Sequence, residues 1–511
     1  MTTLFSAAPS YCSRFGVAML LAALADFLFY GQPAGITVFL FALMIAAAVV
    51  AVHPAAFSDG RVWLKPIALL VALLPLAENV STLSVSIALA ALVVFALSLS
   101  GRLRHSIARI AGQIVLFGLA APFRFANDFI RWRRTARRFG GRRIRLAAIA
   151  VWVMPLTLSA VFLALFGAAN PVIDYWLSLI DLVRLLDLIQ LARIAFWLFV
   201  LAAVWAFLRP RLPRLVRRIP RAAPAVGAQA EKTATTIEDI LFGKAAILRA
   251  LIAFNILFAL QTALDATYLW GGAALPDGLS YAAYAHRGAY PLIVTALLAA
   301  GFVLAALRPG SETSADPLIR RLVYAWVAQN IMLVVSSILR LDLYIGIYAL
   351  TYWRVAAFVW MGLVAAGLAL IIARIALGKS NEWLLSANLL TLSLTLYAGC
   401  FINFAATIAN YNVDHSLEMT GQGIPLDAWY LRSLGPGAFP ALDRFLEHQG
   451  KTAAGTVREL AGVRGSDEIW YRTIQQSWRA WSFRDWRLLR TLDTKGPPVI
   501  PSAIEPSMPG R

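Results

Sequence analysis

The sequence predicts an all-α polytopic membrane protein of about eleven transmembrane helices, with a small helical domain at its C-terminal end. Three observations support this fold class. Hydrophobic residues make up 60% of the 511 residues and charged residues only 14%, too few to coat a soluble protein of this length. The apolar residues form runs of roughly 17–25, which cross about 30 Å of hydrocarbon as helices. From Tyr411 onward the chain is instead rich in tryptophan, with twelve basic and eleven acidic side chains.

The predicted spans follow the apolar runs in chain order. Each run is long enough to cross the bilayer, and most are separated by short polar loops. The predicted spans are 15–31, 34–53, 63–79, 82–100, 146–168, 189–208, 246–266, 290–308, 321–339, 353–376 and 384–409.

Two basic loops predict the orientation of these spans. Residues 131–145 contain eight arginines and residues 209–221 contain six. Lys and Arg concentrate in cytoplasmic loops, so both loops are predicted to lie inside, which places the N-terminus inside and the C-terminus outside. The short basic loops then also fall inside, and the acidic or neutral loops fall outside. This pattern accounts for the net charge of +19, and we therefore predict no nucleic-acid partner.

Three segments do not read as simple spans. Residues 106–132 are apolar at the centre and basic at the end, which predicts a cytoplasmic helix lying in the membrane interface. The alternative is a twelfth span, which would place Arg102 and the eight-arginine loop on opposite sides. Residues 170–193 predict an amphipathic helix on the outer surface. Residues 221–240, rich in Ala, Pro, Thr and Gln, predict a flexible linker.

These segments divide the chain into five parts. We predict an N-terminal membrane half, a basic cytoplasmic linker, a C-terminal membrane half, an outer helical domain and a disordered tail, at 1–208, 209–245, 246–410, 411–494 and 495–511. Within the outer domain we expect helices at 426–434, 438–448 and 466–492, with Ser466 starting the last one.

The familiar catalytic motifs are missing from the sequence. There is no phosphate-binding loop, HExxH, nucleophile elbow or dinucleotide fingerprint. The five histidines are scattered, and the two cysteines lie near opposite ends of the chain. We therefore predict no metal, no cofactor and no catalytic residue of a known type, although an enzyme with an unfamiliar site stays open.

One segment at the predicted outer surface indicates an anion site. Tyr284, His286 and Arg287 precede Pro291, which suits the first position of the next span. His286 and Arg287 would then lie at the positive end of a helix dipole, where a lipid phosphate, a carboxylate or an acidic side chain can bind. The alternative is that Arg287 reaches up to lipid headgroups and the tyrosines form an aromatic belt.

Further ionisable residues are predicted near the same level. Asp265 ends the seventh span, Arg340 ends the ninth and Arg354 begins the tenth. A structural ion pair of Asp265 with Arg340 or Arg287 is the alternative to a binding role. Asp26, inside the first span, is predicted to be either structural or a group that couples proton or ion movement.

Four motifs in this sequence resemble one bacterial family. They are Tyr284-Ala-His-Arg-Gly-Ala-Tyr-Pro-Leu-Ile, Asn410-Tyr-Asn-Val-Asp, the run from Tyr430 to Leu442, and Trp478-Arg-Ala-Trp-Ser-Phe-Arg-Asp-Trp. They are similar to multi-pass inner-membrane proteins catalogued as domain of unknown function 4173 or its close relative 4153, over roughly residues 246–490. The resemblance implies a bacterial inner membrane, and therefore a periplasmic position for the outer domain. It implies no substrate.

The sequence is compatible with three functions. The first is a transporter or lipid-handling protein that binds an anionic or lipid-linked molecule at the outer leaflet. The second is a non-catalytic sensor or scaffold that acts through the periplasmic domain and the basic loops. The third is a membrane enzyme on a lipid-linked substrate. We favour the first, with membrane lipids as the expected partners.

Overall fold

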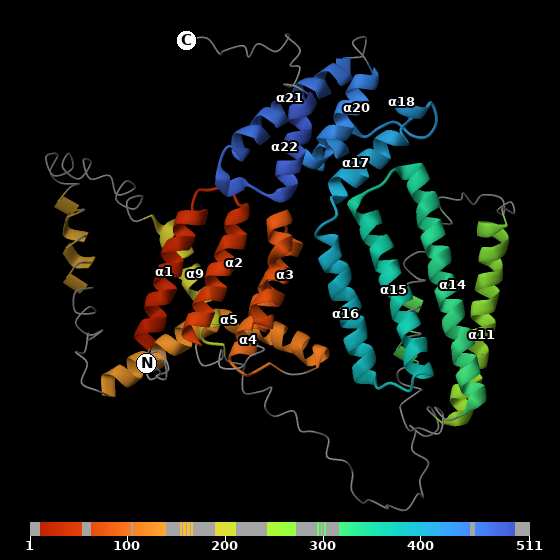
Figure 1. Cartoon of the computed structure of the whole chain (residues 1–511), viewed down its shortest axis with the longest axis horizontal. Coiled ribbons are helices and arrows are strands. Elements are labelled where there is room, and N and C mark those ends of the chain that lie inside the picture. The colour runs from red at the N-terminus through yellow and green to blue at the C-terminus, as the bar shows by residue number, and fades with distance from the viewer. Residues whose placement is uncertain are drawn as a thin grey trace, which may run out of the picture. The chain divides into compact units, whose positions relative to one another are not determined.

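Every regular element that the structure describes is helical (Figure 1). This computed structural model describes residues 11–53, 63–103, 106–138, 190–210, 243–271, 316–449 and 455–495, with short pieces of 154–166 and 294–302. The described chain separates into two compact units. Unit 1 takes in 1–74, 88–103 and 112–219, and unit 2 takes in 75–87, 104–111 and 220–511. An all-helical membrane protein is thereby confirmed.

Unit 1 is built on the packing of its first helix against two others. Its helices are α1 Tyr11–Phe29, α2 Ile36–Val52, most of α3 Leu64–Glu78 and of α4 Thr82–Leu99, α5 Ile107–Arg138 from Gly112 onward, and α9 Leu191–Leu208. The fully buried positions of α1 include Ala18, Ala22 and Ala25. Small side chains let helix backbones approach closely, which explains how α1 packs tightly on α9 and α2.

Helix α5 runs across the end of α9 rather than alongside it. Phe117 contacts Phe207 at 5.5 Å between ring centroids, and Trp132 stacks on Tyr11, which also contacts Trp205. Phe125 also contacts Trp205 in the last turns of α9, whereas Trp132, about 22 Å from Phe117 along the axis of α5, reaches them through Tyr11. Figure 1 shows this crosswise course at the end of unit 1 where α1 begins. By length and composition alone, Ile107–Trp132 would also qualify as a span.

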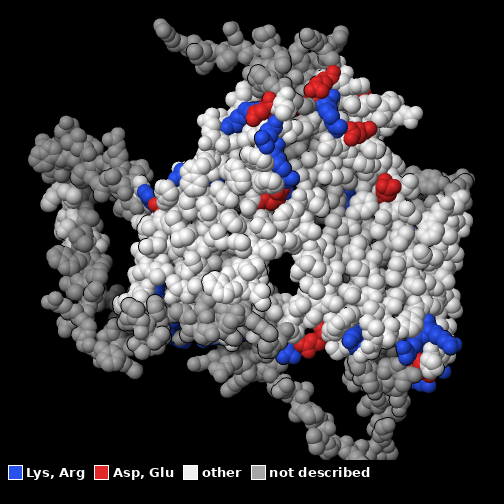
Figure 2. Space-filling view, in the orientation of Figure 1, with Lys and Arg blue, Asp and Glu red and all other residues white. Residues whose placement is uncertain are grey.

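Four long helices form the described membrane part of unit 2. They are α11 Lys244–Asp265, α14 Pro317–Tyr348, α15 Tyr352–Ala376 and α16 Asn381–Gly399. Asp316 caps α14 by accepting from the backbone N–H groups of Leu318 and Ile319. Trp326 of α14 stacks on Phe254 of α11 at 5.1 Å, inside a core that continues into the C-terminal helices. Figure 2 shows an uncharged surface on these helices between charged ends.

The eleventh predicted span, 384–409, is not one continuous helix. The helix stops at Gly399, and α17 Phe404–Asp414 begins after a bend of 69°. Asn403 has non-helical backbone angles, and its side chain caps α17 by accepting from the N–H of Ala406 at 3.2 Å. Hydropathy did not reveal this break because the residues on both sides of it are apolar.

The C-terminal domain is formed by the helices that follow α17. They are α18 Leu417–Thr420, α19 Ala428–Ser433, α20 Phe439–Gln449, α21 Gly455–Gln475 and α22 Phe483–Lys495. The single helix predicted at 466–492 is wrong, because α21 begins earlier and a break separates it from α22. Trp481 is extended at that break, and Ser482 and Asp485 exchange hydrogen bonds across the start of α22.

Nine of the eleven predicted spans fall on described helices, whereas 146–168 and 290–308 lie largely outside the described residues. Within the described part, seven helices are long and apolar enough to cross a membrane, or eight if α16 and α17 form one bent span. The remaining predictions at 170–193, 221–240 and 495–511 fall almost entirely outside that part. The count of eleven and the orientation stay predictions.

Candidate functional site

Asp265 and Arg340 form a buried ion pair between α11 and α14. Their side chains are only 1% and 4% exposed. Gln261 adds a hydrogen bond from its amide nitrogen to Asp265 Oδ1 at 3.0 Å. Directly after Asp265 the chain widens into a π-helical turn, Ala266–Trp270. The structure thus brings together two of the predicted site residues in the arrangement that the sequence left open as a structural alternative.

Arg354 also has partners close to it in the chain. Its guanidinium donates to the backbone carbonyls of Tyr348 and Ala349 and lies 4.7 Å from the ring centroid of Tyr344. Ala349 has a positive φ of 63°, so these contacts stabilise an unfavourable turn between α14 and α15. Arg354 therefore has a clear structural role at the predicted outer level.

The other predicted residues have different outcomes. Tyr284, His286 and Arg287 lie outside the described residues, so the anion site at that helix start stays a prediction. Asp26 receives two hydrogen bonds from the guanidinium of Arg193, one of them at 2.9 Å from Nε to Oδ1. This bidentate pair joins α1 to α9, which explains how a carboxylate is tolerated in an apolar helix.

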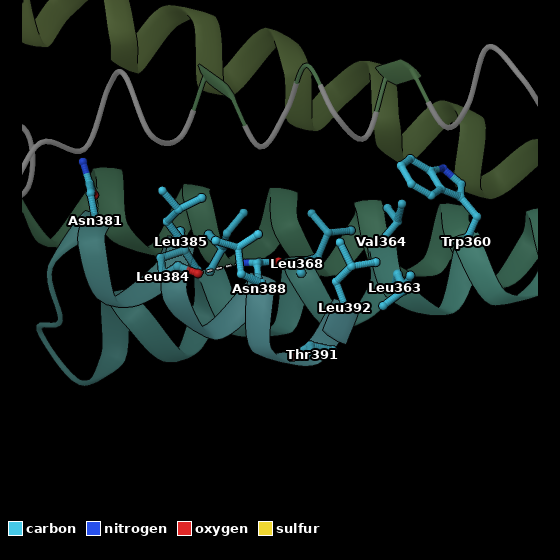
Figure 3. Close-up of a pocket in the computed structure, with 13 residues that line it drawn as sticks. Trp360, Leu363, Val364, Leu368, Asn381, Leu384, Leu385, Asn388, Thr391 and Leu392 are labelled. Carbon is cyan, nitrogen blue, oxygen red and sulfur yellow. Dashed lines mark hydrogen bonds between the residues drawn. The ribbon is translucent and has the colours of Figure 1, made fainter. Parts of the chain in front are cut away.

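A pocket lies between α15 and α16, and the sequence did not single it out. Its volume is about 550 Å³, within the range of small-molecule sites. Figure 3 shows Trp360 at one end, Asn381 at the other, and leucine side chains between them. Its wall is mostly leucine, isoleucine and valine, with Asn381, Asn388 and Thr391 as the polar contributions.

The close contact of the two helices at Gly367 shapes this pocket. A Cβ atom at Gly367 would come within 3.0 Å of Asn388 Oδ1, so glycine is what allows the approach. The amide of Asn388 donates to the carbonyl of Leu384 at 2.9 Å within α16. Asn381 and Asn388 are seven residues apart and therefore share one helix face. This spacing was the feature of the sequence that could have indicated the pocket.

A second feature that the sequence did not reveal is the anchor of α22. Arg484 and Arg487 both pair with Glu78, the buried last residue of α3, which belongs to unit 2. Arg484 also donates to the carbonyl of Cys400 at 2.7 Å, just beyond α16. The Trp478–Trp486 motif thus joins the C-terminal domain to the ends of two membrane helices. Among the described residues, no group of three His, Cys, Asp or Glu side chains could hold a metal ion.

Most of the chain matches one known protein family. The family described as domain of unknown function (DUF4153) matches residues 64–445, well over half of the chain. The chain belongs to the DUF4153 family. No curated protein and no solved structure matches it.

The DUF4153 region differs from the extent that the sequence motifs suggested. It begins far earlier than residue 246, so it includes Glu78 and α5 as well as Asp265, Arg340 and the pocket. It ends before Trp478, so α22 and its tryptophan motif lie beyond it, and Asp26 precedes it. The Asp265–Arg340 pair and the pocket are therefore features of the family region in this chain.

Proposed function

We propose that this DUF4153 protein handles membrane lipids and holds an acyl chain in the pocket between α15 and α16. The single observation that carries the proposal is the pocket itself, with an elongated apolar wall between α15, which qualifies as a membrane span, and α16, which qualifies together with α17. Trp360 and Ile371 line it eleven residues apart, about 16 Å along α15. An apolar pocket of this length suits a hydrocarbon chain better than a polar metabolite.

The polar end of the pocket indicates where a headgroup would lie. Asn381 begins α16, next to the exposed Lys379 and Glu382. Glu382 pairs with Arg109 at 3.3 Å, with both side chains at least half exposed. In the orientation that the basic loops favour, this end faces the cytoplasm. The proposed occupant is therefore a lipid of the inner leaflet of a bacterial inner membrane, with the C-terminal domain in the periplasm.

An outer-leaflet anion site at His286 and Arg287 is a separate part of the proposal. It is supported by the helix-dipole argument from the sequence. Arg340 already pairs with Asp265, and Arg354 already donates to backbone carbonyls. The proposed anion site therefore does not include these two guanidinium groups. Two lipid sites at opposite levels would suit a protein that moves or presents lipids, which is the transport hypothesis in a narrower form.

A second candidate function is a scaffold or sensor that acts through the C-terminal domain. The specific observation in its favour is the exposure of Trp429, Trp470 and Trp478, which are 59%, 66% and 51% exposed. Exposed aromatic side chains mark interaction surfaces more often than ordinary surface. Under this hypothesis, deleting residues 411–511 would abolish the scaffold or sensor function. Under the lipid hypothesis, the truncated protein is expected to retain its co-purified lipid.

Two leucines of α16 provide a matched test of the lipid proposal. Leu385 lines the pocket and is 53% exposed, whereas the exposed Leu390, at 47%, is not among the lining residues. Leu385→Trp is expected to fill the pocket and to reduce the lipid that survives purification, as counted by native mass spectrometry. Leu390→Trp adds the same volume and is expected to retain wild-type lipid. Equal lipid retention in both variants would count against the proposal.

A further inference from the structure

Basic side chains gather at the end of unit 1 where α1 begins and where α2, α4 and α9 end. Arg102 follows α4 and donates to the carbonyl of Pro210, just beyond α9. Arg209 pairs with Asp128 of α5 at 3.1 Å. Arg124 of α5 lies close enough to Arg102 and Asp128 for their charges to interact. Asp128 is thus one carboxylate among three guanidinium groups.

Several hydrogen-bond donors around Asp128 are buried without an acceptor among the described residues. Both terminal nitrogens of Arg124 are buried in this way, and so are Nε of Arg209 and the hydroxyl of Tyr11. Asp128 Oδ2 already accepts from Arg209 and from the indole N–H of Trp205 at 3.2 Å. Buried donors are almost always satisfied, because leaving one without an acceptor forfeits the hydrogen bond that it would make with water. The described residues therefore offer these donors no acceptor, and a ligand with several oxygen atoms could supply it.

The helix that crosses this end holds Arg124 in place. The guanidinium carbon of Arg124 lies 4.2 Å from the ring centroid of Phe117, one of the fully buried side chains. Phe117 in turn packs on Phe207 of α9. A guanidinium stacked on an aromatic ring keeps its in-plane N–H groups available for an anion. Arg124 is thus positioned to donate rather than to extend into solvent.

We propose that Tyr11, Arg124 and Arg209 form a binding site for a phosphate group, supplied by a phospholipid headgroup or by free phosphate. Phosphate offers several acceptor oxygens and negative charge, which match the four donor atoms of this cationic cluster that have no acceptor among the described residues. In the favoured orientation this end lies at the cytoplasmic surface, where α5 runs across the bundle and α1, α2, α4 and α9 meet the headgroups. The site lies in unit 1, so it is independent of the pocket between α15 and α16.

The test uses full-length protein in a nonionic detergent, titrated with phosphatidylglycerol and read by native mass spectrometry. Diacylglycerol with the same chains serves as the ligand that lacks phosphate. Phosphatidylglycerol is expected to bind and diacylglycerol is not. Arg124→Gln is expected to weaken the binding of phosphatidylglycerol by about tenfold or more, the effect of losing one charge-assisted hydrogen bond. Arg131→Gln, an exposed charge on the same helix, is the matched control and is expected to bind like wild type.

Tyr11→Phe keeps the proposal testable if Arg124→Gln fails to fold. It removes a buried hydroxyl that has no partner in the part of the chain that the structure describes, so the lipid-free variant is expected to be at least as stable as wild type while binding phosphatidylglycerol more weakly. If inorganic phosphate competes with phosphatidylglycerol for binding, free phosphate is identified as the ligand. If inorganic phosphate does not compete, the lipid headgroup is identified as the ligand. Equal affinity of Arg124→Gln and Arg131→Gln, or equal binding of diacylglycerol, would overturn the proposal. Leu385→Trp leaves this binding unchanged, which separates the site from the acyl-chain pocket.

Discussion

The carboxylate of Asp265 and the guanidinium of Arg340 pair with each other inside the helix bundle of unit 2, each with at most 4% of its side chain exposed. Removing two charges from water is costly, and mutual attraction repays that cost only when both partners stay together. The pair therefore joins α11 to α14, and it sits where α11 changes to a wider helical turn.

Breaking this pair is expected to be far more harmful than replacing it. Asp265→Asn or Arg340→Met leaves one charge buried and is expected to lower the free energy of unfolding by about 3–5 kcal/mol. The double variant Asp265→Leu with Arg340→Met is expected to recover most of that loss. Unfolding by sodium dodecyl sulfate measures both. A double variant that folds yet loses its co-purified lipid would instead show that Arg340 takes part in binding.

The anchor of α22 gives a prediction for the C-terminal domain. Glu78→Gln weakens the pairing with Arg484 and Arg487 and is expected to cost about 1–3 kcal/mol. Amide hydrogen exchange in α22 is expected to accelerate by about tenfold or more, since 1.4 kcal/mol corresponds to a factor of ten. Glu382→Gln is the control, because its pair with Arg109 is exposed and contributes about 0–1 kcal/mol. Unchanged exchange in Glu78→Gln would contradict the anchor.

Tyr471 is expected to make the stability of the C-terminal domain sensitive to high pH. Burial raises the pKa of Tyr471, and the neighbouring Asp485, which accepts from its hydroxyl at 2.9 Å, raises it further. The unfolded tyrosine ionises near pH 10, so this part of the stability is expected to be lost above about pH 10. Tyr471→Phe is expected to cost about 0.5–1.5 kcal/mol at neutral pH and to reduce the alkaline loss. Proteolysis of the domain across pH measures both effects.

The sequence predicted the membrane helices well because length and apolar composition decide whether a segment can span. It failed where a single side chain ends a helix. Asn403 interrupts an apolar run, and Ser482 restarts a helix inside a stretch that otherwise looks continuous. Local capping competes with hydropathy on the scale of one residue, which a window of about 19 residues averages out.

The sites were harder to predict than the spans. The charged partners are distant along the chain, so the sequence indicated Asp26 without Arg193 and indicated neither partner of the pair between Glu78 and Arg484. The pocket depends on how α15 and α16 approach at Gly367, which is a packing property of two helices. The sequence did place Asp265 and Arg340 at one level and raised their pairing as an alternative.

An experimental density map of the full-length protein in nanodiscs of bacterial lipid tests the acyl-chain proposal most directly. The lipid proposal predicts elongated density between α15 and α16, running from the level of Trp360 toward Asn381 and ending in a headgroup beside Asn381. Leu385→Trp is expected to remove that density, while Leu390→Trp is expected to keep it. A pocket filled by the protein's own chain, or one that holds only water, would contradict the proposal.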